Sequence, residues 1–183
     1  MNKETDDKFL ELLDPLRDKL FMYALLLEKN HTDAEDLASD TILTMYEYFP
    51  KLKDESAFKA YLFKTARSKF RRKKRRSKFF GLFDDKQASN IISHEPPPDM
   101  PLDVKMLYEA LDQLPGEQKE ALVLFEISGF SIKEIAEMQK ATVTAVKSRL
   151  KRGREKLASI LTEDNDDKIN SNAKNEVSQQ GDK

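Results

Sequence analysis

Apolar residues recur at intervals of three and four along most of this chain, and this spacing constrains the fold more than any other feature. The first such run consists of Phe9, Leu12, Leu13, Leu16, Leu20 and Tyr23. This period places side chains on one face of an α-helix, and no stretch shows the alternation expected of a half-buried strand. Only five of the 183 residues are glycines, the residue that most favours left-handed turns. The pattern predicts an all-α protein.

The helical pattern breaks once, between residues 79 and 102. This segment contains an apolar Phe-Phe-Gly-Leu-Phe run, then polar residues, then Pro96-Pro97-Pro98. Such composition predicts a flexible linker. We therefore expect a helical domain at 1–78, a linker at 79–102, a second helical domain at 103–161 and a disordered polar tail at 162–183.

Three helices are expected in the first domain. The first runs from about Asp7 to Glu28, with a possible kink at Pro15. The second begins at a capping box, Thr32-Asp-Ala-Glu35, in which a threonine oxygen and a glutamate side chain satisfy free backbone amides. It ends near Phe49. The third begins near Asp54 and continues into a run of lysine and arginine.

Capping residues also mark the helices expected in the second domain. One helix covers about 103–113, and another starts with Pro115 in its first turn and ends near Ser128. Ser131-Ile-Lys-Glu134 is a second capping box, for a short helix that ends near Gln139. Thr142 is a suitable cap for a longer helix that reaches about Leu161.

Charge is strongly segregated along the chain, although 32 basic and 33 acidic residues leave a formal net charge of −1. Acidic residues crowd the first 55 positions. None occurs from Ser56 to Phe83, where basic residues are dense. This asymmetry indicates a polyanionic partner.

Several classes of function are disfavoured. The chain has no cysteine, His31 and His94 are isolated, and no glycine-rich phosphate loop or paired nucleophile and base is present. We expect no catalysis, no metal, no cofactor and no small-molecule substrate. The apolar runs are too short to span a membrane and no secretory signal is visible, so we expect no membrane insertion and a cytoplasmic location.

The two helices expected at 131–161 have the pattern of a helix-turn-helix. On the second, Val143, Val146, Leu150 and Leu157 share one face. The opposite face carries Thr144, Ser148, Lys151 and Arg152, with Lys147 and Arg149 on its flanks. Such a helix can enter the DNA major groove, where arginine binds guanine and lysine attracts phosphate. The alternative is a solvated amphipathic helix.

Aromatic and basic residues interleave in the third helix of the first domain. Phe58, Tyr61, Phe63 and Phe70 alternate there with lysine and arginine. Aromatic rings can stack on bases while cations contact phosphate, as in proteins that bind single strands. Two alternatives stay open: Phe58, Tyr61 and Leu62 suit a protein core, and Lys73–Arg76 suits any polyanion or a membrane surface.

Longer motifs carry a family resemblance. Leu114-Pro-Gly-Glu-Gln-Lys-Glu-Ala-Leu, Gly129-Phe-Ser-Ile-Lys-Glu-Ile-Ala-Glu and Val146-Lys-Ser-Arg-Leu-Lys-Arg-Gly-Arg-Glu-Lys-Leu resemble region four of bacterial RNA polymerase sigma factors. Asp33-Ala-Glu-Asp-Leu-Ala-Ser-Asp and Ala57-Phe-Lys-Ala-Tyr-Leu-Phe-Lys-Thr-Ala-Arg-Ser resemble region two. Both occur in the order of the extracytoplasmic-function (ECF) subfamily of the sigma-70 superfamily. Lys140 stands where the family usually has a left-handed glycine, so the turn either carries a cost of about 1–2 kcal/mol or is reshaped.

The resemblance implies three sets of site residues. The core polymerase-binding face, directed at the clamp, would comprise Asp36, Leu37, Ser39, Asp40 and Leu43. The minus-ten DNA set would comprise Lys59, Tyr61, Lys64, Arg67, Ser68, Arg71 and Arg72. The minus-thirty-five set, in a domain that also docks on the polymerase flap, would comprise Thr142, Thr144, Lys147, Ser148, Arg149, Lys151 and Arg152. For the first set, a solvated acidic helix with buried Leu37 and Leu43 is the alternative.

The resemblance thus predicts a sigma factor that binds core RNA polymerase and then recognises and melts promoter DNA. It also leaves room for an anti-sigma factor, a partner that this family commonly has. One rival is a helix-turn-helix regulator that acts on duplex DNA without being a polymerase subunit. A second is an enzyme that acts on nucleic acid. For the apolar residues of 79–83, contact with polymerase and packing between the domains both stay open.

Overall fold

The computed structural model describes residues 3–79 and 101–179, with side chains over 3–77, 101–102 and 104–162. All regular structure in these residues is helical, which confirms the predicted all-α class. The N-terminal domain contains α1 (Lys3–Leu13), α2 (Arg17–Glu28), α3 (His31–Tyr48) and α4 (Phe58–Phe79). The C-terminal domain contains α5 (Leu102–Asp112), α6 (Gly116–Leu122), α7 (Ile132–Gln139) and α8 (Val143–Gln179). Most of the predicted linker, including Phe80, Leu82 and Phe83, lies outside the described residues.

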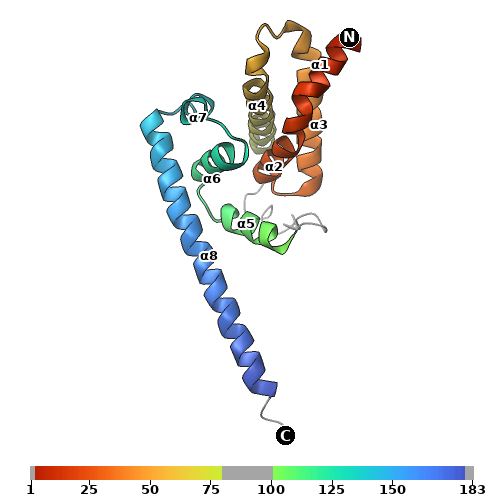
Figure 1. Cartoon of the computed structure of the whole chain (residues 1–183). Coiled ribbons are helices and arrows are strands. Elements are labelled where there is room, and N and C mark those ends of the chain that lie inside the picture. The colour runs from red at the N-terminus through yellow and green to blue at the C-terminus, as the bar shows by residue number, and fades with distance from the viewer. Residues whose placement is uncertain (1–2, 80–100, 180–183) are drawn as a thin grey trace.

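The first predicted helix is divided in two at Pro15. The segment Asp14–Leu16 is a 3₁₀ turn between α1 and α2, and Arg17 Nε donates to Asp14 Oδ1 at 2.9 Å across it. Proline has no N–H to donate and its ring crowds the preceding turn, so the α-helical ladder is interrupted there. The break lets α1 and α2 follow different directions (Figure 1).

The start of α3 differs from the predicted capping box. Asn30 is the N-cap, and its side-chain oxygen accepts from the backbone N–H of Asp33 at 2.8 Å. Thr32 and Glu35 lie inside the helix. Asparagine is at least as good a cap as threonine, and Asn30 also donates from Nδ2 to Asp33 Oδ2 at 2.6 Å. This second bond fixes the earlier start.

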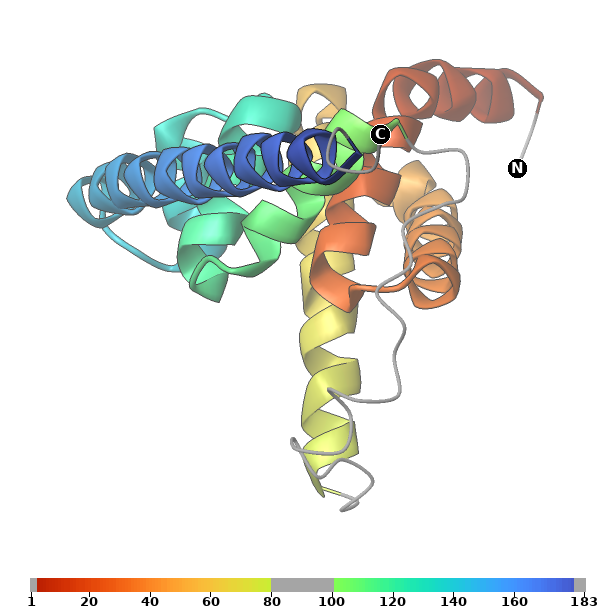
Figure 2. The same ribbon diagram turned by 90° about the horizontal axis from the view of Figure 1, so that it is seen from below.

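Aromatic rings fill the core of the N-terminal domain. Phe9 from α1 meets Tyr46, Phe49 and Phe58 edge to face, with centroid distances of 5.2, 5.4 and 5.6 Å. Such pairs contribute about 0.5–1.5 kcal/mol each beyond the area they bury. The cluster joins the start of α4 to α1 and α3, and so fixes where the basic helix leaves the domain. Figure 2 shows the C-terminal half of α4 projecting beyond its neighbours.

Helix α6 gives way to a π-helical segment, Val123–Ile127, where the sequence predicts one continuous α-helix to Ser128. The N–H of Ser128 donates to Val123 O at 2.9 Å, five residues back. The sequence places Pro115 in the first turn of this helix, whereas in the structure Pro115 is the N-cap of α6, one position before that turn. π-Helical turns are rare and widen the helix locally.

Both predicted caps of the helix-turn-helix are confirmed. The N–H of Glu134 donates to Ser131 Oγ at 3.3 Å, and the N–H of Ser131 donates to Glu134 Oε2 at 2.8 Å. Thr142 Oγ1 accepts from the N–H of Ala145 at 3.1 Å. These bonds satisfy amides that the first turns of α7 and α8 leave free.

Gly153 allows α8 to pack closely against α6. A Cβ built on this buried glycine would lie 2.9 Å from Leu122 Cδ1 and 3.3 Å from Leu122 Cγ. No larger residue fits without displacing a leucine that is itself buried. Val146 and Leu150 are buried on the same side of α8, as predicted, whereas Val143 is 39% exposed.

Helix α8 continues to Gln179, past the end near Leu161 that the sequence predicts; no glycine or proline occurs between Gly153 and Gly181 to end it. The two domains pack against each other through contacts that include those of Lys59 and Arg67. In Figure 1, α5, α6 and α7 lie between α8 and the N-terminal domain.

Candidate nucleic-acid interface

The basic helix α4 has a buried face and an exposed face. Phe58, Leu62, Phe63 and Ala66 are at most 1% exposed, so the core alternative is correct for Phe58 and Leu62. Tyr61 is 43% exposed. The exposed residues of the predicted minus-ten set are Tyr61, Lys64, Ser68, Arg71 and Arg72. They form one basic surface along α4, part of which, at Lys64, Ser68 and Arg71, faces the end of α7.

Tyr61 has an aromatic neighbour at this surface. Its ring stacks on Tyr48, at the end of α3, with a centroid distance of 5.8 Å and an interplanar angle of 28°. Both tyrosines are exposed, whereas the rings of Phe58 and Phe63 on α4 are buried and that of Phe70 is half-buried. A flat, exposed aromatic surface beside cations is suited to stacking with an unpaired base.

Lys59 and Arg67, from the same predicted set, turn instead toward the C-terminal domain. Lys59 Nζ donates to Gly129 O at 2.7 Å and lies 4.1 Å from the centroid of the Phe130 ring. Burial lowers the pKa of Lys59. Phe130 in turn meets Phe63 edge to face at 5.0 Å. A cation predicted to contact DNA is therefore occupied by a backbone carbonyl and an aromatic face.

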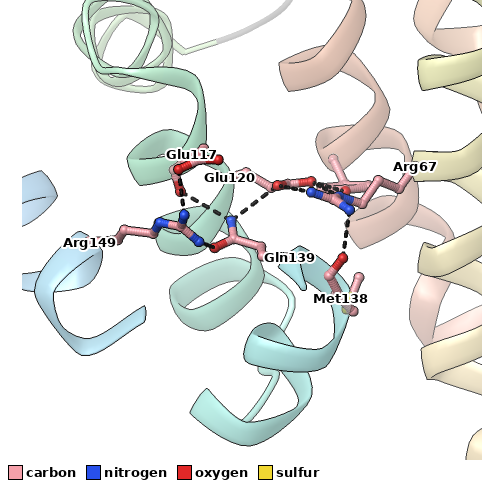
Figure 3. Close-up of polar contacts among 7 residues, drawn as sticks. Arg67, Glu117, Glu120, Met138, Gln139 and Arg149 are labelled. Carbon is pink, nitrogen blue, oxygen red and sulfur yellow. Dashed lines mark hydrogen bonds and ion pairs between the residues drawn. The ribbon is translucent and has the colours of Figure 1, made fainter. Parts of the chain in front are cut away.

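Arg67 makes the most extensive contact between the domains. Its Nε donates to Glu120 Oε1 at 2.6 Å, its Nη2 to Glu120 Oε2 at 3.1 Å and its Nη1 to Met138 O at 2.6 Å. The Arg67 side chain is only 12% exposed. Burial alone would lower the pKa of Arg67, but the hydrogen bonds and charge of Glu120 raise it. Figure 3 shows the two-pronged contact between guanidinium and carboxylate.

Glu120 is the centre of a buried polar network. Besides Arg67, it accepts from Tyr23 Oη at 2.9 Å and from Gln139 Nε2 at 3.1 Å. Burial, and then the Glu120 carboxylate, raise the pKa of Tyr23 well above its ordinary value. Four donated hydrogen bonds compensate for taking the carboxylate out of water. The buried charge is stable only while both domains contribute donors.

The recognition-helix candidate α8 presents most of its predicted DNA face to solvent. Thr142, Thr144, Lys147, Ser148, Lys151 and Arg152 are exposed. Thr142 uses its hydroxyl as the helix cap, which leaves that oxygen less available for DNA. Arg149 is half-buried: its Nη1 donates to Gln139 Oε1 at 2.8 Å, and its Nη2 donates to Glu117 Oε2 (Figure 3).

The turn before α8 keeps the left-handed conformation despite its lysine. Lys140 has φ 51° and ψ 48°, and the N–H of Ala141 donates to Ala136 O at 2.9 Å. Of the two alternatives for this turn, retention at a conformational cost of about 1–2 kcal/mol is therefore the correct one. The short connection between α7 and α8 has the geometry of a helix-turn-helix.

The acidic face of α3 is exposed apart from one residue. Asp36, Ser39 and Asp40 are exposed and Leu43 is 57% exposed, an unusual position for an isolated leucine beside two carboxylates. Leu37 is buried at 6% exposure and belongs to the domain core. The alternative in which both leucines are buried therefore holds for Leu37 and fails for Leu43.

A cleft of about 810 Å³ separates α4 from the end of α7. It is lined mainly by basic residues of α4, with Glu137, Met138 and Lys140 on the opposite side. The Lys64 ammonium crosses it to Glu137, with 3.8 Å between Nζ and Oε2. The cleft continues the basic surface of α4 up to the helix-turn-helix.

Sequence patterns missed the residues that join the domains. The motifs of the sequence assign no role to Glu117, Glu120, Gln139 or Gly153. One signal for Glu120 is its place four residues before Leu124, which is buried in the π-helical segment after α6. An acid on a buried stripe indicates a buried partner.

Within the described residues, no group of three or more acidic, histidine or cysteine side chains could hold a metal ion. The same residues contain no helix that is both long and apolar enough to cross a membrane.

Comparison with known proteins identifies two matching family models. The model described as sigma-70 region 2 matches residues 12–80, and the model described as sigma-70 region 4 matches residues 105–157. The first contains α2 to α4 and the second contains the helix-turn-helix. Their order and positions agree with the two domains of the structure.

Three proteins match more than four fifths of this chain. An ECF RNA polymerase sigma factor, EcfG of Rhodopseudomonas palustris, is 32% identical over 83% of this chain and 88% of its own length. The sigma factor RpoE of Bartonella quintana, solved in complex with the anti-sigma factor NepR, is 28% identical, has a TM-score of 0.69 and is matched over 98% of its length and 88% of this chain. CnrH, solved with the cytosolic domain of CnrY, is 23% identical with a TM-score of 0.64 over 87% of this chain and 90% of CnrH, which supports the fold.

Proposed function

Because the chain belongs to the ECF sigma factors of the sigma-70 family, it is a non-catalytic subunit that directs RNA polymerase to promoters, and we propose which of its surfaces perform each part of that task. The observation that carries the assignment is the separation of three exposed surfaces. One is acidic and lies on α3; the other two are basic and lie on α4 and α8. Their opposite charges suit a protein partner for the first and nucleic acid for the others.

Core polymerase binds the acidic face of α3. Asp36, Ser39, Asp40 and Leu43 form this surface, in which the exposed leucine supplies apolar contact and the carboxylates supply charge. Leu37 supports the face from within the core. The partner surface is expected to be basic with an apolar recess, and the clamp of the polymerase is the part assigned to it.

The paired substitution Asp36→Ala with Asp40→Ala tests this face. Affinity for core polymerase should fall at least tenfold, because the two carboxylates supply the charge of this face. Both are exposed, so their removal should leave the fold intact. Asp7→Ala with Glu11→Ala removes two exposed acids from α1 and is the matched control. Unchanged affinity for the α3 variant, or equal loss in both variants, contradicts the assignment.

Melted minus-ten DNA binds α4. Tyr61 offers a stacking surface, and Lys64, Arg71 and Arg72 follow it along about 17 Å of the same side of α4, where they can contact successive phosphates. Ser68 can bond to a base or a phosphate. Lys59 and Arg67 belong to this site only when the C-terminal domain no longer occupies them.

Duplex minus-thirty-five DNA binds α8. Arg152 is the exposed arginine of the predicted set and the candidate for a two-bond contact with guanine. Thr144, Lys147, Ser148 and Lys151 lie along the same exposed surface, where hydroxyls and ammonium groups suit base edges and phosphates. The flap of the polymerase is the proposed support for this domain.

Run-off transcription tests the function as a whole. Purified core polymerase should start at specific promoters only when this chain is added. Templates are chosen by genomic footprinting of the chain. A regulator that acts without being a polymerase subunit would instead bind promoters tightly on its own and add no specificity to core polymerase.

Regulation by an anti-sigma factor and a cytoplasmic location complete the proposal. The Bartonella quintana sigma factor was solved with an anti-sigma factor, and the likeness to this chain supports a partner of the same class. Adding that partner to the run-off reaction should abolish specific initiation. The location follows from the polymerase partner, and fractionation of cells should recover the chain together with RNA polymerase.

A further inference from the structure

We propose that the cleft between α4 and the end of α7 is a binding site for a small polyphosphate, either inorganic pyrophosphate or the phosphate chain of a nucleotide. The site has one wall from each domain. It includes Lys74, Arg75 and Lys140, which belong to none of the predicted sets of site residues. Its occupant also differs from the DNA proposed for α4 and α8, so the inference goes beyond the proposed function.

The size of the cleft suits a small molecule. Its volume of about 810 Å³ falls within the range of roughly 300–1,000 Å³ that small-molecule sites occupy. A DNA duplex, whose major groove alone is about 12 Å wide, is too large for this space. The cleft is therefore a place for a ligand of a different class from the proposed minus-thirty-five DNA.

Cations from both walls face the cleft. Arg71, Lys74 and Arg75 follow one another at intervals of three and four residues, so they share one side of α4. The exposed Ser68 adds a hydroxyl, and Lys140 lies on the opposite wall. Arginine donates two hydrogen bonds to a phosphate, and lysine contributes charge. Cations on two walls favour a ligand with several charged oxygens over a single carboxylate.

These cations differ from other basic residues of α4 in having no acidic partner. Lys73 Nζ, on the same helix, lies 2.7 Å from Asp33 Oδ1. Arg71, Arg75 and Lys140, by contrast, form no ion pair with a carboxylate of the residues that the structure describes. Like charges one helical turn apart repel each other. An anion bound between them replaces this repulsion with attraction.

Lys140 supplies its charge from a strained backbone conformation. Its φ of 51° lies in the left-handed region, which glycine adopts at no steric cost. Backbone strain of this kind is concentrated at ligand and catalytic sites. Glu137 and Met138 are the other residues that line the α7 wall, so a glycine at position 140 would leave that wall without a cation.

A bound polyphosphate has two consequences for the protein. It joins Lys140 to Arg71 and Arg75, so it stabilises the arrangement in which both walls are present. Arg71 also belongs to the predicted minus-ten set, so the anion competes with a melted strand for this side chain. Only this second consequence rests on the proposed function of α4.

Isothermal titration calorimetry of the full chain with sodium pyrophosphate tests the site. At constant ionic strength, one pyrophosphate should bind per chain, and Arg71→Gln with Arg75→Gln should weaken binding at least tenfold. The matched control is Arg72→Gln with Arg76→Gln, which removes the same charge from the same turns of α4 outside the cleft. The control should change the affinity less than about threefold, because exposed charges outside the site are screened by salt.

Lys140→Gly tests the second wall. Affinity for pyrophosphate should fall about threefold or more, although the free variant should unfold at a higher temperature than the free parent because its turn is unstrained. Added pyrophosphate should raise the unfolding temperature of the parent more than that of the variant. A purely structural role for Lys140 would not combine higher stability with weaker binding.

A titration with ADP distinguishes the two sources of the phosphate group. Tighter binding of ADP than of pyrophosphate assigns the site to a nucleotide, and equal or weaker binding assigns it to the inorganic anion. Absence of saturable binding for both ligands, or equal loss in the two arginine pairs, overturns the site. Unchanged affinity in Lys140→Gly overturns its second wall.

These outcomes are independent of the proposed function, because the titrations contain neither polymerase nor DNA and run-off transcription by the parent reports the sigma function. Competition is measured separately: pyrophosphate should displace a single-stranded minus-ten oligonucleotide from the parent chain. Pyrophosphate binding without displacement supports the anion site and counts against the assignment of Arg71 to minus-ten DNA.

Discussion

The two basic helices, α4 and α8, are alike in composition and different in availability. Both carry lysine and arginine on one face and apolar residues on the other. On α8 nearly all predicted DNA-binding residues are exposed, and the half-buried Arg149 is held by Gln139 and Glu117 of its own domain. On α4 the outer cations are exposed, but Lys59 and Arg67 are bound by the other domain.

The difference shows that charge pattern predicts what a helix can bind but not when it can bind it. Arg67 satisfies every compositional criterion for a phosphate contact and is nonetheless fully occupied. Availability depends on tertiary partners that are remote in sequence. A carboxylate of the protein and a phosphate of DNA compete for the same arginine, and the one that binds more tightly determines whether the arginine is available to DNA.

The largest expected effect tests whether the two domains are separate folding units. Phe9→Ala removes the ring that joins α1 to α3 and α4, and should cost about 3–5 kcal/mol of N-terminal domain stability. Denaturation followed by residue-resolved NMR should show α2 to α4 unfolding first. If α5 to α8 unfold in the same transition, the contacts of Arg67 and Lys59 couple the two domains into one folding unit.

Gly153→Val tests the scaffold of α8 alone. The side chain would collide with Leu122, and overpacking of this kind costs about 1–3 kcal/mol. Thermal unfolding should show the loss in the C-terminal domain. Gly116→Ala is the control, because a Cβ there meets nothing within 4 Å and should have little effect. Equal destabilisation by both would contradict the packing argument, because helix propensity alone favours alanine and valine over glycine.

Charge removal tests the division of labour between the helices. In the holoenzyme, Lys151→Ala with Arg152→Ala should weaken binding to a minus-thirty-five duplex roughly tenfold, about 1.4 kcal/mol, and flatten its salt dependence. Arg71→Ala with Arg72→Ala should instead weaken binding to a minus-ten single strand. Fluorescence anisotropy at several salt concentrations measures both. If either double variant weakens binding to both DNAs equally, α4 and α8 do not divide the two DNA ligands between them.

The smallest expected effect concerns two left-handed lysines, one in each domain. Lys140→Gly relieves the strain at φ 51° and should stabilise the C-terminal domain by about 0.5–1 kcal/mol. Lys29, at φ 67°, also pairs with Asp112 across the domain contact at 3.7 Å, so Lys29→Gly should gain less. Urea denaturation compares the two. A larger gain at Lys29 would mean that its ion pair contributes nothing.

Local patterns in the sequence were enough to predict much of the fold. The Ser131 capping box, the Thr142 cap and the buried Val146 and Leu150 follow from hydrogen bonding and periodicity within a few residues. Where two local solutions competed, prediction failed: Asn30 and Thr32 are both good caps, and only the extra bond to Asp33 distinguishes them. Pro15 predicted an interruption of the first helix, but not that the interruption is a 3₁₀ turn.

The sequence predicted which residues belong to the candidate site, but not which of them are already bound by other side chains. The sequence identified Arg67 and Arg149 as cations on suitable faces. That Glu120 lies opposite Arg67 depends on the docking of two domains, because the two residues are 53 positions apart in the sequence. No short-range pattern encodes such a contact. The exposure of Leu43, by contrast, agrees with periodicity: at 3.6 residues per turn it lies on the side of Asp36 and Ser39, opposite the buried residues of α3.

The π-helical segment at Val123–Ile127 has a consequence for how the contact between the two domains could change during evolution. A π turn holds one residue more than an α turn, so deleting a single residue there would restore the ordinary ladder. The chain beyond the segment would rotate by about 100° relative to α6. Gly129 and Phe130, which hold Lys59, would turn away from α4. One in-frame codon loss, rather than a series of substitutions, could thus release this half of the domain contact while leaving every DNA-binding residue unchanged.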